Sequence, residues 1–145
     1  MEITGDESFY KGGITVEAKR FLEEYKKIDA MILNKTIEAE QWEALAQSIT
    51  VQMGERVQST SNQQKMQDYI CNKIDIESEI DVLIAKKKDI TDTIEQLPMA
   101  DYNILHKIYI QSLSFKEIAG INDYSSVTTA HGRALQRLQK ILDGR

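Results

Sequence analysis

The chain has 145 residues, of which 41% are hydrophobic and 28% are charged, and this composition is typical of a globular protein. Its single cysteine, Cys71, excludes an internal disulfide and favours a reducing intracellular environment. No apolar run approaches the roughly 20 residues needed to cross a bilayer, so no membrane association is expected.

The net charge of −5 is unevenly distributed along the chain. Residues 1–96 carry 12 Lys/Arg and 19 Asp/Glu, whereas residues 97–145 carry 6 Lys/Arg and 4 Asp/Glu. An anionic partner is therefore expected to bind the C-terminal third rather than the rest of the chain.

The predicted elements begin after a polar start. Residues 1–14 contain three glycines and no apolar period, which predicts a flexible tail without a signal peptide. From Thr15 to about residue 50, apolar residues step by four and three, as expected for one long amphipathic helix. This stripe consists of Phe21, Tyr25, Ile28, Ile32, Lys35, Ala39, Trp42, Ala46 and Ile49.

A second long helix is predicted over residues 63–96, after a polar loop at residues 51–62. Its stripe consists of Tyr69, Lys73, Ile76, Ile80, Leu83, Lys87, Ile90, Ile94 and Leu97. Two stripes of similar length joined by one loop predict an antiparallel helical hairpin with coiled-coil-like packing over residues 15–96. A single hairpin leaves apolar surface uncovered, so we expect self-association, most simply as a dimer.

Pro98, the only proline, suits the first turn of a new helix and marks the predicted start of a C-terminal unit, residues 97–145. Three helices are expected there, over residues 98–112, 114–120 and 125–142. Ser114 and Glu117 have the spacing of a capping box, which predicts the start of the short middle helix. An all-α fold is therefore expected, with a helix-turn-helix order at its C-terminal end.

The last helix is predicted to carry one apolar and one basic polar side. At 100° per residue, Val127, Ala134 and Leu138 fall on one side, and Thr129 and Arg133 on the other. Small hydroxyl residues can approach base edges, Arg can bind guanine, and Lys can bind phosphate. The candidate DNA-binding residues are Ser125, Ser126, Thr128, Thr129, Arg133, Gln136, Arg137, Lys140 and Lys116.

The strings LPMADYNILHKIYIQSLSFKEIAG and HGRALQRLQKIL resemble region four of bacterial sigma factors. The layout of the whole chain is similar to small phage and prophage proteins of Gram-positive bacteria, and to phage transcriptional regulators of the ArpU/RinA type. The resemblance implies a regulator that binds double-stranded DNA in the cytoplasm of a bacterial host and contacts RNA polymerase. One departure is a turn before the last helix that is shorter by about two residues and contains Asn122-Asp123.

Other chemistry is not indicated. His106 and Cys71 lack partners at ligand spacing, so no metal site and no cofactor are expected. No phosphate-binding glycine motif or nucleophile–base motif occurs, so we expect no enzyme and no catalytic residues. His131, at the edge of the apolar face, is expected to pack against a neighbouring helix rather than to contact phosphate. Gly132, in mid-helix, is compatible with close approach of either another helix or a DNA backbone.

Three functions remain open from the sequence. The first is a DNA-binding transcriptional regulator whose hairpin mediates oligomerisation or polymerase contact. The second is a protein-interaction module that uses sigma-like helices without touching DNA. The third is a small structural phage protein in which the hairpin is the functional part.

Overall fold

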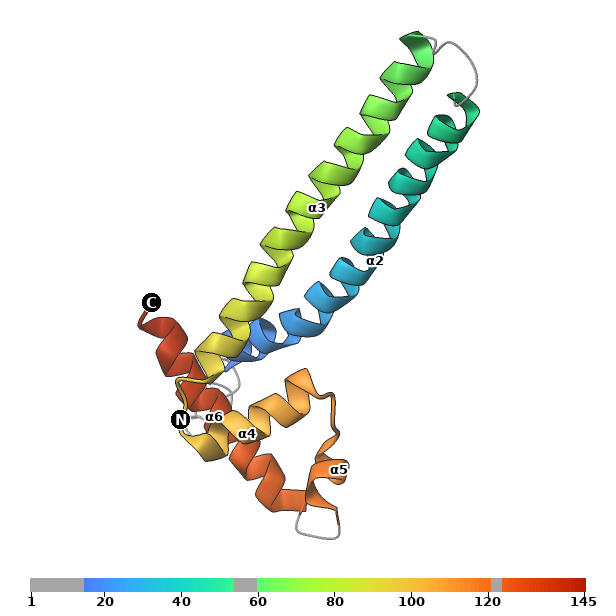
Figure 1. The fold of residues 1–145 in the computed structure, drawn as a ribbon. Helices are drawn as coiled ribbons and strands as arrows, with labels where there is room; N and C mark the ends of the chain where they lie inside the picture. Colours follow the sequence, from blue (N-terminus) through green and yellow to red (C-terminus); the bar gives the residue numbers. More distant parts are fainter. Residues whose placement is uncertain (1–14, 54–59, 121–123) are drawn as a thin grey trace, which may run out of the picture. The chain divides into compact units, whose positions relative to one another are not determined.

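The computed structural model describes residues 15–53, 60–120 and 124–145, and within these ranges the chain is helical and contains no strand (Figure 1). The elements are α2 (Val16–Met53), α3 (Thr60–Ile94), α4 (Met99–Leu105), the π-helix η1 (His106–Ile110), α5 (Phe115–Ala119) and α6 (Tyr124–Asp143). The expected all-α class is confirmed. The first long helix ends later than predicted and the second begins earlier, so the helices extend into the expected loop at residues 51–62.

The predicted tail at residues 1–14, the middle of that loop and the turn with Asn122-Asp123 lie outside the described residues. None of the described helices combines the length and apolar character needed to span a membrane. The predicted helix over residues 98–112 is divided into α4 and η1. The π-helical turn is followed by Ser112, which adopts a φ of +64°.

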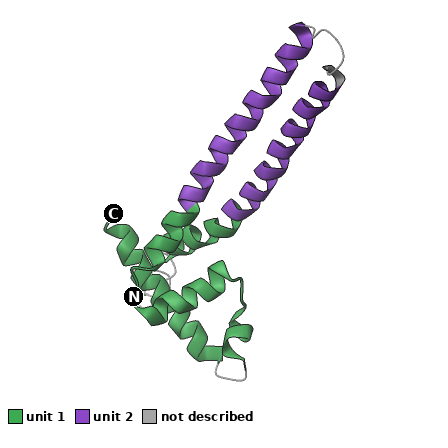
Figure 2. Ribbon diagram, in the orientation of Figure 1, with its two compact units in different colours: residues 1–27, 87–145 green, residues 28–86 purple. Residues whose placement is uncertain are grey.

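The chain forms two compact units (Figure 2). Unit 1 comprises residues 1–27 and 87–145, and unit 2 comprises residues 28–86. The division therefore falls within α2 and α3, whereas the sequence placed the boundary at residues 96–97, where α3 gives way to α4. A local signal such as Pro98 marks the start of a helix, but compactness depends on which helix segments pack together.

Unit 2 contains α2 from Ile28 onwards and α3 up to Lys86, and these two helix segments run antiparallel. As the contacting residue in α2 moves from Lys35 to Glu43, its partner in α3 moves back from Glu79 to Lys73. Trp42 lies against Tyr69 with ring centroids 5.6 Å apart, consistent with the same register. Two lysines that interrupt the predicted apolar stripes form ion pairs between the helices. Lys35 Nζ lies 2.6 Å from Glu79 Oε2, and Lys73 Nζ lies 3.5 Å from Glu43 Oε1. The hydrogen bond from Lys35 to Glu79 also raises the pKa of the lysine.

Unit 1 contains most of the buried core. Its fully buried side chains include Leu22 of α2, Ile94 of α3, Leu105 of α4 and Leu138 of α6. Helix α6 packs against both α4 and α5. Because four helices contribute to this core, α6 has one face fixed by packing and the opposite face exposed.

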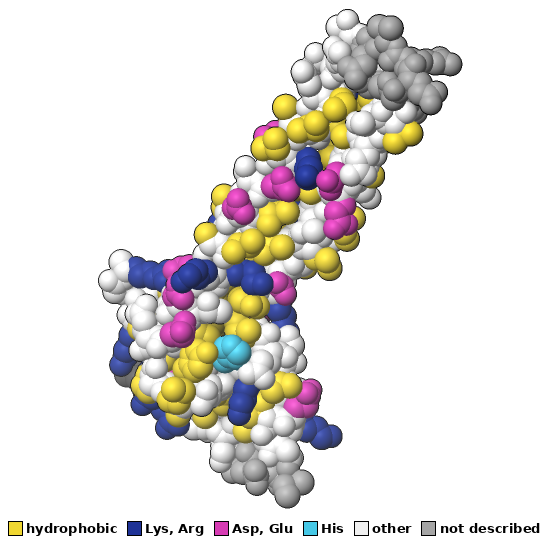
Figure 3. Space-filling model, viewed as in Figure 1, with side chains coloured by type: hydrophobic (Ala, Val, Ile, Leu, Met, Phe, Trp, Pro, Cys, Tyr) yellow, Lys and Arg dark blue, Asp and Glu magenta, His cyan; other side chains and the backbone are white. Residues whose placement is uncertain are grey.

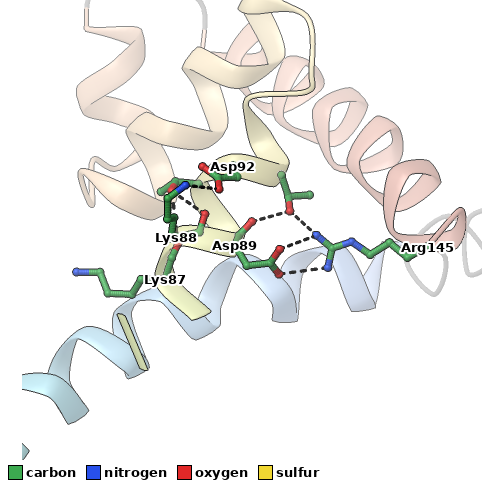
Figure 4. Close-up of polar contacts among 7 residues, drawn as sticks. Lys87, Lys88, Asp89, Asp92 and Arg145 are labelled. Atoms are coloured by element: carbon green, nitrogen blue, oxygen red, sulfur yellow. Dashed lines mark hydrogen bonds and ion pairs between the residues drawn. The ribbon is translucent and has the colours of Figure 1, made fainter. Parts of the chain in front are cut away.

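Long-range polar contacts fasten α6 and the residues that follow it to the remainder of unit 1. The buried Gln139 side chain accepts a hydrogen bond from the backbone N–H of Ala18 (2.8 Å), satisfying one of the open donors in the first turn of α2. Arg145 binds both carboxylate oxygens of Asp89 at 3.1 and 3.2 Å, and Figure 4 shows its guanidinium facing that side chain. The same arginine lies over the Phe21 ring, 5.3 Å from its centroid.

Candidate nucleic-acid interface

Residues close in sequence determine where α5 begins and ends. The Ser114 hydroxyl accepts a hydrogen bond from the Glu117 N–H (3.1 Å), and the Glu117 carboxylate accepts one from the Ser114 N–H (3.4 Å). The predicted capping box is confirmed. The helix ends at Gly120, whose φ of +58° lies in the left-handed region that glycine tolerates best.

An aromatic cluster joins η1, α5 and α6. The Tyr109 hydroxyl lies 2.8 Å from His131 Nε2, and the two rings are stacked with centroids 5.7 Å apart. Phe115 contacts the His131 ring edge-on at 4.9 Å and the Tyr124 ring at 5.9 Å. The expected packing role of His131 is confirmed. These contacts fix the rotation of α6 about its axis, which decides the side that α6 presents to solvent.

Burial also sets the protonation of this cluster. Burial, and secondarily the charge of Lys19, lowers the pKa of His131 below its ordinary value of 6.5. Burial, with a smaller effect from the Glu23 carboxylate, raises the pKa of Tyr109 to about 12. Both groups are therefore neutral at pH 7, and the cluster adds no charge to the neighbouring surface.

All nine residues predicted to contact DNA are exposed in the structure. Eight of them lie on α6, which brings them onto one helix, and the ninth, Lys116, lies on α5. Thr129, Arg133, Gln136 and Lys140 are spaced by four, three and four residues, so they form a continuous row along the solvent side. The hydroxyl of Thr128 donates a hydrogen bond to the backbone oxygen of Tyr124 (3.2 Å).

Cations on α6 differ in whether they have a carboxylate partner. Arg133 and Lys140, like Lys116 of α5, have no ion-pair partner within the described ranges of the chain. Arg137 instead lies 2.6 Å from Asp101 Oδ2, and the Asp101 side chain is only 3% exposed. Arg137 therefore connects α6 to α4, a structural role that the sequence did not predict.

The sequence did not predict the buried contacts of Asp101 and Gln139, because their partners are distant in sequence. Asp101 is separated by four residues from Leu105 and by eight from Tyr109, so the apolar period placed a carboxylate on a buried face. Gln139 similarly lies between Leu135 and Leu142 on the packed side of α6. A charged or amide side chain on an apolar face signals a buried partner, although it does not identify that partner.

Gly132 occupies an open position in the middle of α6. A Cβ built at this residue would meet no atom within 4 Å. Close approach of another described helix therefore does not explain the glycine. Gly132 lies next to the exposed row, three residues after Thr129 and four before Gln136.

Lysine and arginine side chains gather over unit 1 on the face shown in Figure 3, whereas unit 2 shows mostly apolar and acidic side chains there. The charge count agrees, because unit 2 contains 5 Lys/Arg and 10 Asp/Glu. Within the described part of the chain, no group of three or more His, Cys, Asp or Glu side chains is arranged to hold a metal ion.

The chain matches no protein-family model, and no curated protein and no solved structure is similar to it. Any functional assignment therefore rests on the residues and geometry of this chain.

Proposed function

We propose that this protein binds double-stranded DNA through the exposed side of α6 and acts as a transcriptional regulator of the sigma region-four type. The observation that carries the proposal is the row of Thr129, Arg133, Gln136 and Lys140. It lies on a helix held by packing on its other side, and its two cations have no carboxylate partner in the described residues. Phosphate groups of DNA would supply the missing counter-charge.

The two halves of this row suit different contacts. Thr129 and Arg133 lie nearer the N-terminal end of α6, where a recognition helix contacts base edges in the major groove. Arginine can bind guanine through two hydrogen bonds, which gives base preference. Lys140 lies towards the other end and, with Lys116 of α5, is suited to phosphate contacts that fix the position of the helix.

The principal test is fluorescence anisotropy with duplex DNA between about 50 and 200 mM salt. Lys140→Ala should weaken binding to every sequence alike and reduce the salt slope by about one. Arg133→Ala should relax base preference at one position by about 1–3 kcal/mol. Lys65→Ala, which removes an exposed lysine from unit 2, is the matched control and should bind as the wild type does. Equal binding by all three variants would refute the assignment.

Gly132 offers a second test that separates DNA approach from folding. Alanine in a helix interior is favoured over glycine by about 1 kcal/mol, and the added methyl group meets nothing here. Gly132→Ala should therefore raise the midpoint of thermal unfolding. If α6 lies close to a DNA backbone, the same substitution should lower DNA affinity. Increased stability with unchanged affinity would show that this part of α6 does not approach DNA closely.

A protein-interaction module is the second candidate, because unit 2 is acidic and exposes many apolar side chains. On this account the exposed row of α6 contacts a protein and never DNA. Absence of DNA binding by the folded wild type at low salt would favour this second function.

A further inference from the structure

The ion pair between Arg137 of α6 and Asp101 of α4 exposes its two partners to different extents. Arg137 Nη1 donates a hydrogen bond to Asp101 Oδ2 at 2.6 Å. The Asp101 side chain is 3% exposed, whereas that of Arg137 is 46% exposed. The pair therefore presents its guanidinium to solvent and keeps its carboxylate inside unit 1.

Arg137 uses only one of its guanidinium nitrogens in contacts with the described residues. Arginine carries its N–H donors in one plane, on Nε and on both Nη atoms. Apart from the bond to Asp101, Arg137 makes no hydrogen bond or ion pair with any residue that the structure describes. The bond to the buried carboxylate restricts the orientation of this plane, and the donors of the other nitrogens remain available to a ligand on the solvent side.

Two further cations lie beside Arg137 on the same helix. Arg133 precedes it by four residues and Lys140 follows it by three, and these spacings make side chains neighbours on a helix surface. Both are exposed and have no ion-pair partner in the described part of the chain. An anion at Arg137 would therefore be attracted by three cations, among which only Arg137 itself is paired with a carboxylate.

The place of Arg137 around the axis of α6 suits a contact with a nucleic-acid backbone. It lies about 80° from Thr129, which puts it beside the exposed row of α6, on the flank that meets α4. When a helix enters the major groove with one side, its flanks come close to the phosphates on either side of the groove. A planar guanidinium can donate two parallel hydrogen bonds to phosphate oxygens.

We propose that Asp101 positions the guanidinium of Arg137 to bind a phosphate group of the DNA backbone beside the exposed row of α6. The inference rests on the proposed DNA-binding function and identifies within it one phosphate contact and the residue that orients it. A long side chain loses rotamer freedom when it binds, and a carboxylate that already holds it reduces this loss. Asp101 is thus a positioning residue that acts through Arg137, in addition to joining α4 to α6.

A charge-neutral replacement of the pair separates DNA contact from the joining of two helices. Asp101→Leu combined with Arg137→Met removes one charge of each sign, and apolar side chains in place of such a pair commonly preserve stability. The double variant should unfold at a urea concentration similar to that of the wild type. Its DNA affinity should nevertheless fall by roughly 10-fold or more, as expected when a hydrogen bond to a charged group is lost.

The matched control is Lys88→Gln combined with Asp92→Asn. It removes an exposed ion pair of unit 1, also without changing the net charge, and should bind DNA as the wild type does. Fluorescence anisotropy with one duplex at one low salt concentration measures all these variants. Wild-type DNA affinity in the stably folded Asp101→Leu, Arg137→Met variant would overturn the inference, since the pair would then only join α4 to α6.

Asp101→Ala tests the positioning role through the direction of its effect. It changes the net charge from −5 to −4, so charge alone would strengthen binding to DNA. If the carboxylate orients Arg137, affinity should instead fall by roughly 3- to 10-fold. Asp92→Ala is the control, because it also removes a carboxylate paired with a cation in unit 1, and it should not weaken binding. Stronger binding by Asp101→Ala would overturn the inference.

Arg137→Lys keeps the positive charge and a partner for Asp101 but presents one nitrogen instead of a planar fork. It should lower DNA affinity several-fold and leave urea unfolding nearly unchanged, and wild-type affinity here would also overturn the inference. If Lys140→Ala weakens binding while the variants of Asp101 and Arg137 do not, only this inference fails. If the wild type binds no DNA, the proposed function fails with it.

Discussion

The two units differ in how they bury their apolar residues. Among the described residues, eleven of the sixteen buried hydrophobic side chains belong to unit 1 and five to unit 2. The exposed large hydrophobic side chains show the reverse, with three in unit 1 and nine in unit 2. Two helices alone cannot cover both of their own outer faces, whereas the segments of unit 1 surround a shared core.

The burial of polar side chains also differs between the two units. Unit 1 buries Asp101, Gln139 and Thr93, and Arg137 pairs with the first of them. In unit 2 the interhelical ion pairs of Lys35 and Lys73 involve carboxylate side chains that are 56% and 49% exposed. The comparison teaches that unit 1 has the packing and buried polar contacts that specify one arrangement, while unit 2 is held by one line of interhelical contacts and leaves much of its apolar surface exposed.

The largest effect should come from the core of unit 1. Leu138 is fully buried, so Leu138→Ala should reduce the free energy of unfolding by about 2–5 kcal/mol. Val51→Ala removes an apolar side chain that is 80% exposed and should change it by less than about 0.5 kcal/mol at concentrations where the chain is monomeric. Urea unfolding followed by circular dichroism measures both effects. Equal losses of stability for the two variants would contradict the difference in packing between unit 1 and unit 2.

Arg137→Ala should have the next largest effect on the free energy of unfolding. It leaves the buried Asp101 carboxylate without its partner, and we expect a loss of about 2–3 kcal/mol, smaller than for a fully buried pair because Arg137 is half-exposed. Lys140→Ala, on the same helix and without an ion-pair partner in the described residues, should leave unfolding nearly unchanged. Similar unfolding curves for both variants would contradict the structural role of Arg137.

Two buried groups of unit 1 should make stability depend on pH. Since the pKa of His131 is lowered, the unfolded chain binds its proton more readily, and stability should fall as the pH drops below about 6.5. Since the pKa of Tyr109 is raised to about 12, stability should also fall as the pH rises above its ordinary value of 10.0. His131→Gln should flatten the acid limb and Tyr109→Phe the alkaline limb in urea titrations. Unaltered limbs would show that neither group is perturbed by folding.

The smallest effect is expected in unit 2. Lys35→Ala removes the shorter of the two interhelical ion pairs given above, but Glu79 remains well hydrated. We expect only a small loss of stability, which diminishes further at high salt. Differential scanning calorimetry at low and high salt tests this. A large, salt-independent loss would mean that unit 2, like unit 1, is held by specific polar contacts.

The helical class, the positions of the helices and the capping box of α5 could be predicted because they depend on residues close in sequence. The exposure of Arg133 and Lys140 was predictable for the same reason, since the apolar period of α6 defines its opposite side. The limits of the helices were less accurate, because the loop residues at 51–62 signal only the general position of a helix end.

Contacts between distant residues could not be predicted. The pairs Arg137–Asp101 and Gln139–Ala18 join residues 36 and 121 positions apart, and no local pattern specifies which helix faces meet. The limits of the compact units depend on such contacts as well. They depend on the first turns of α2 packing with the segment from residue 87 onwards, whereas Pro98 marks only the start of α4.

The most direct test of the DNA-binding proposal is a map of backbone amide chemical-shift changes when the full-length protein is titrated with duplex DNA at low salt. We predict changes concentrated at Thr129, Arg133, Gln136 and Lys140, with further changes near Lys116 and little change in residues 28–86. No change at saturating DNA, or changes confined to residues 28–86, would contradict the assignment of α6 as the DNA-contacting helix.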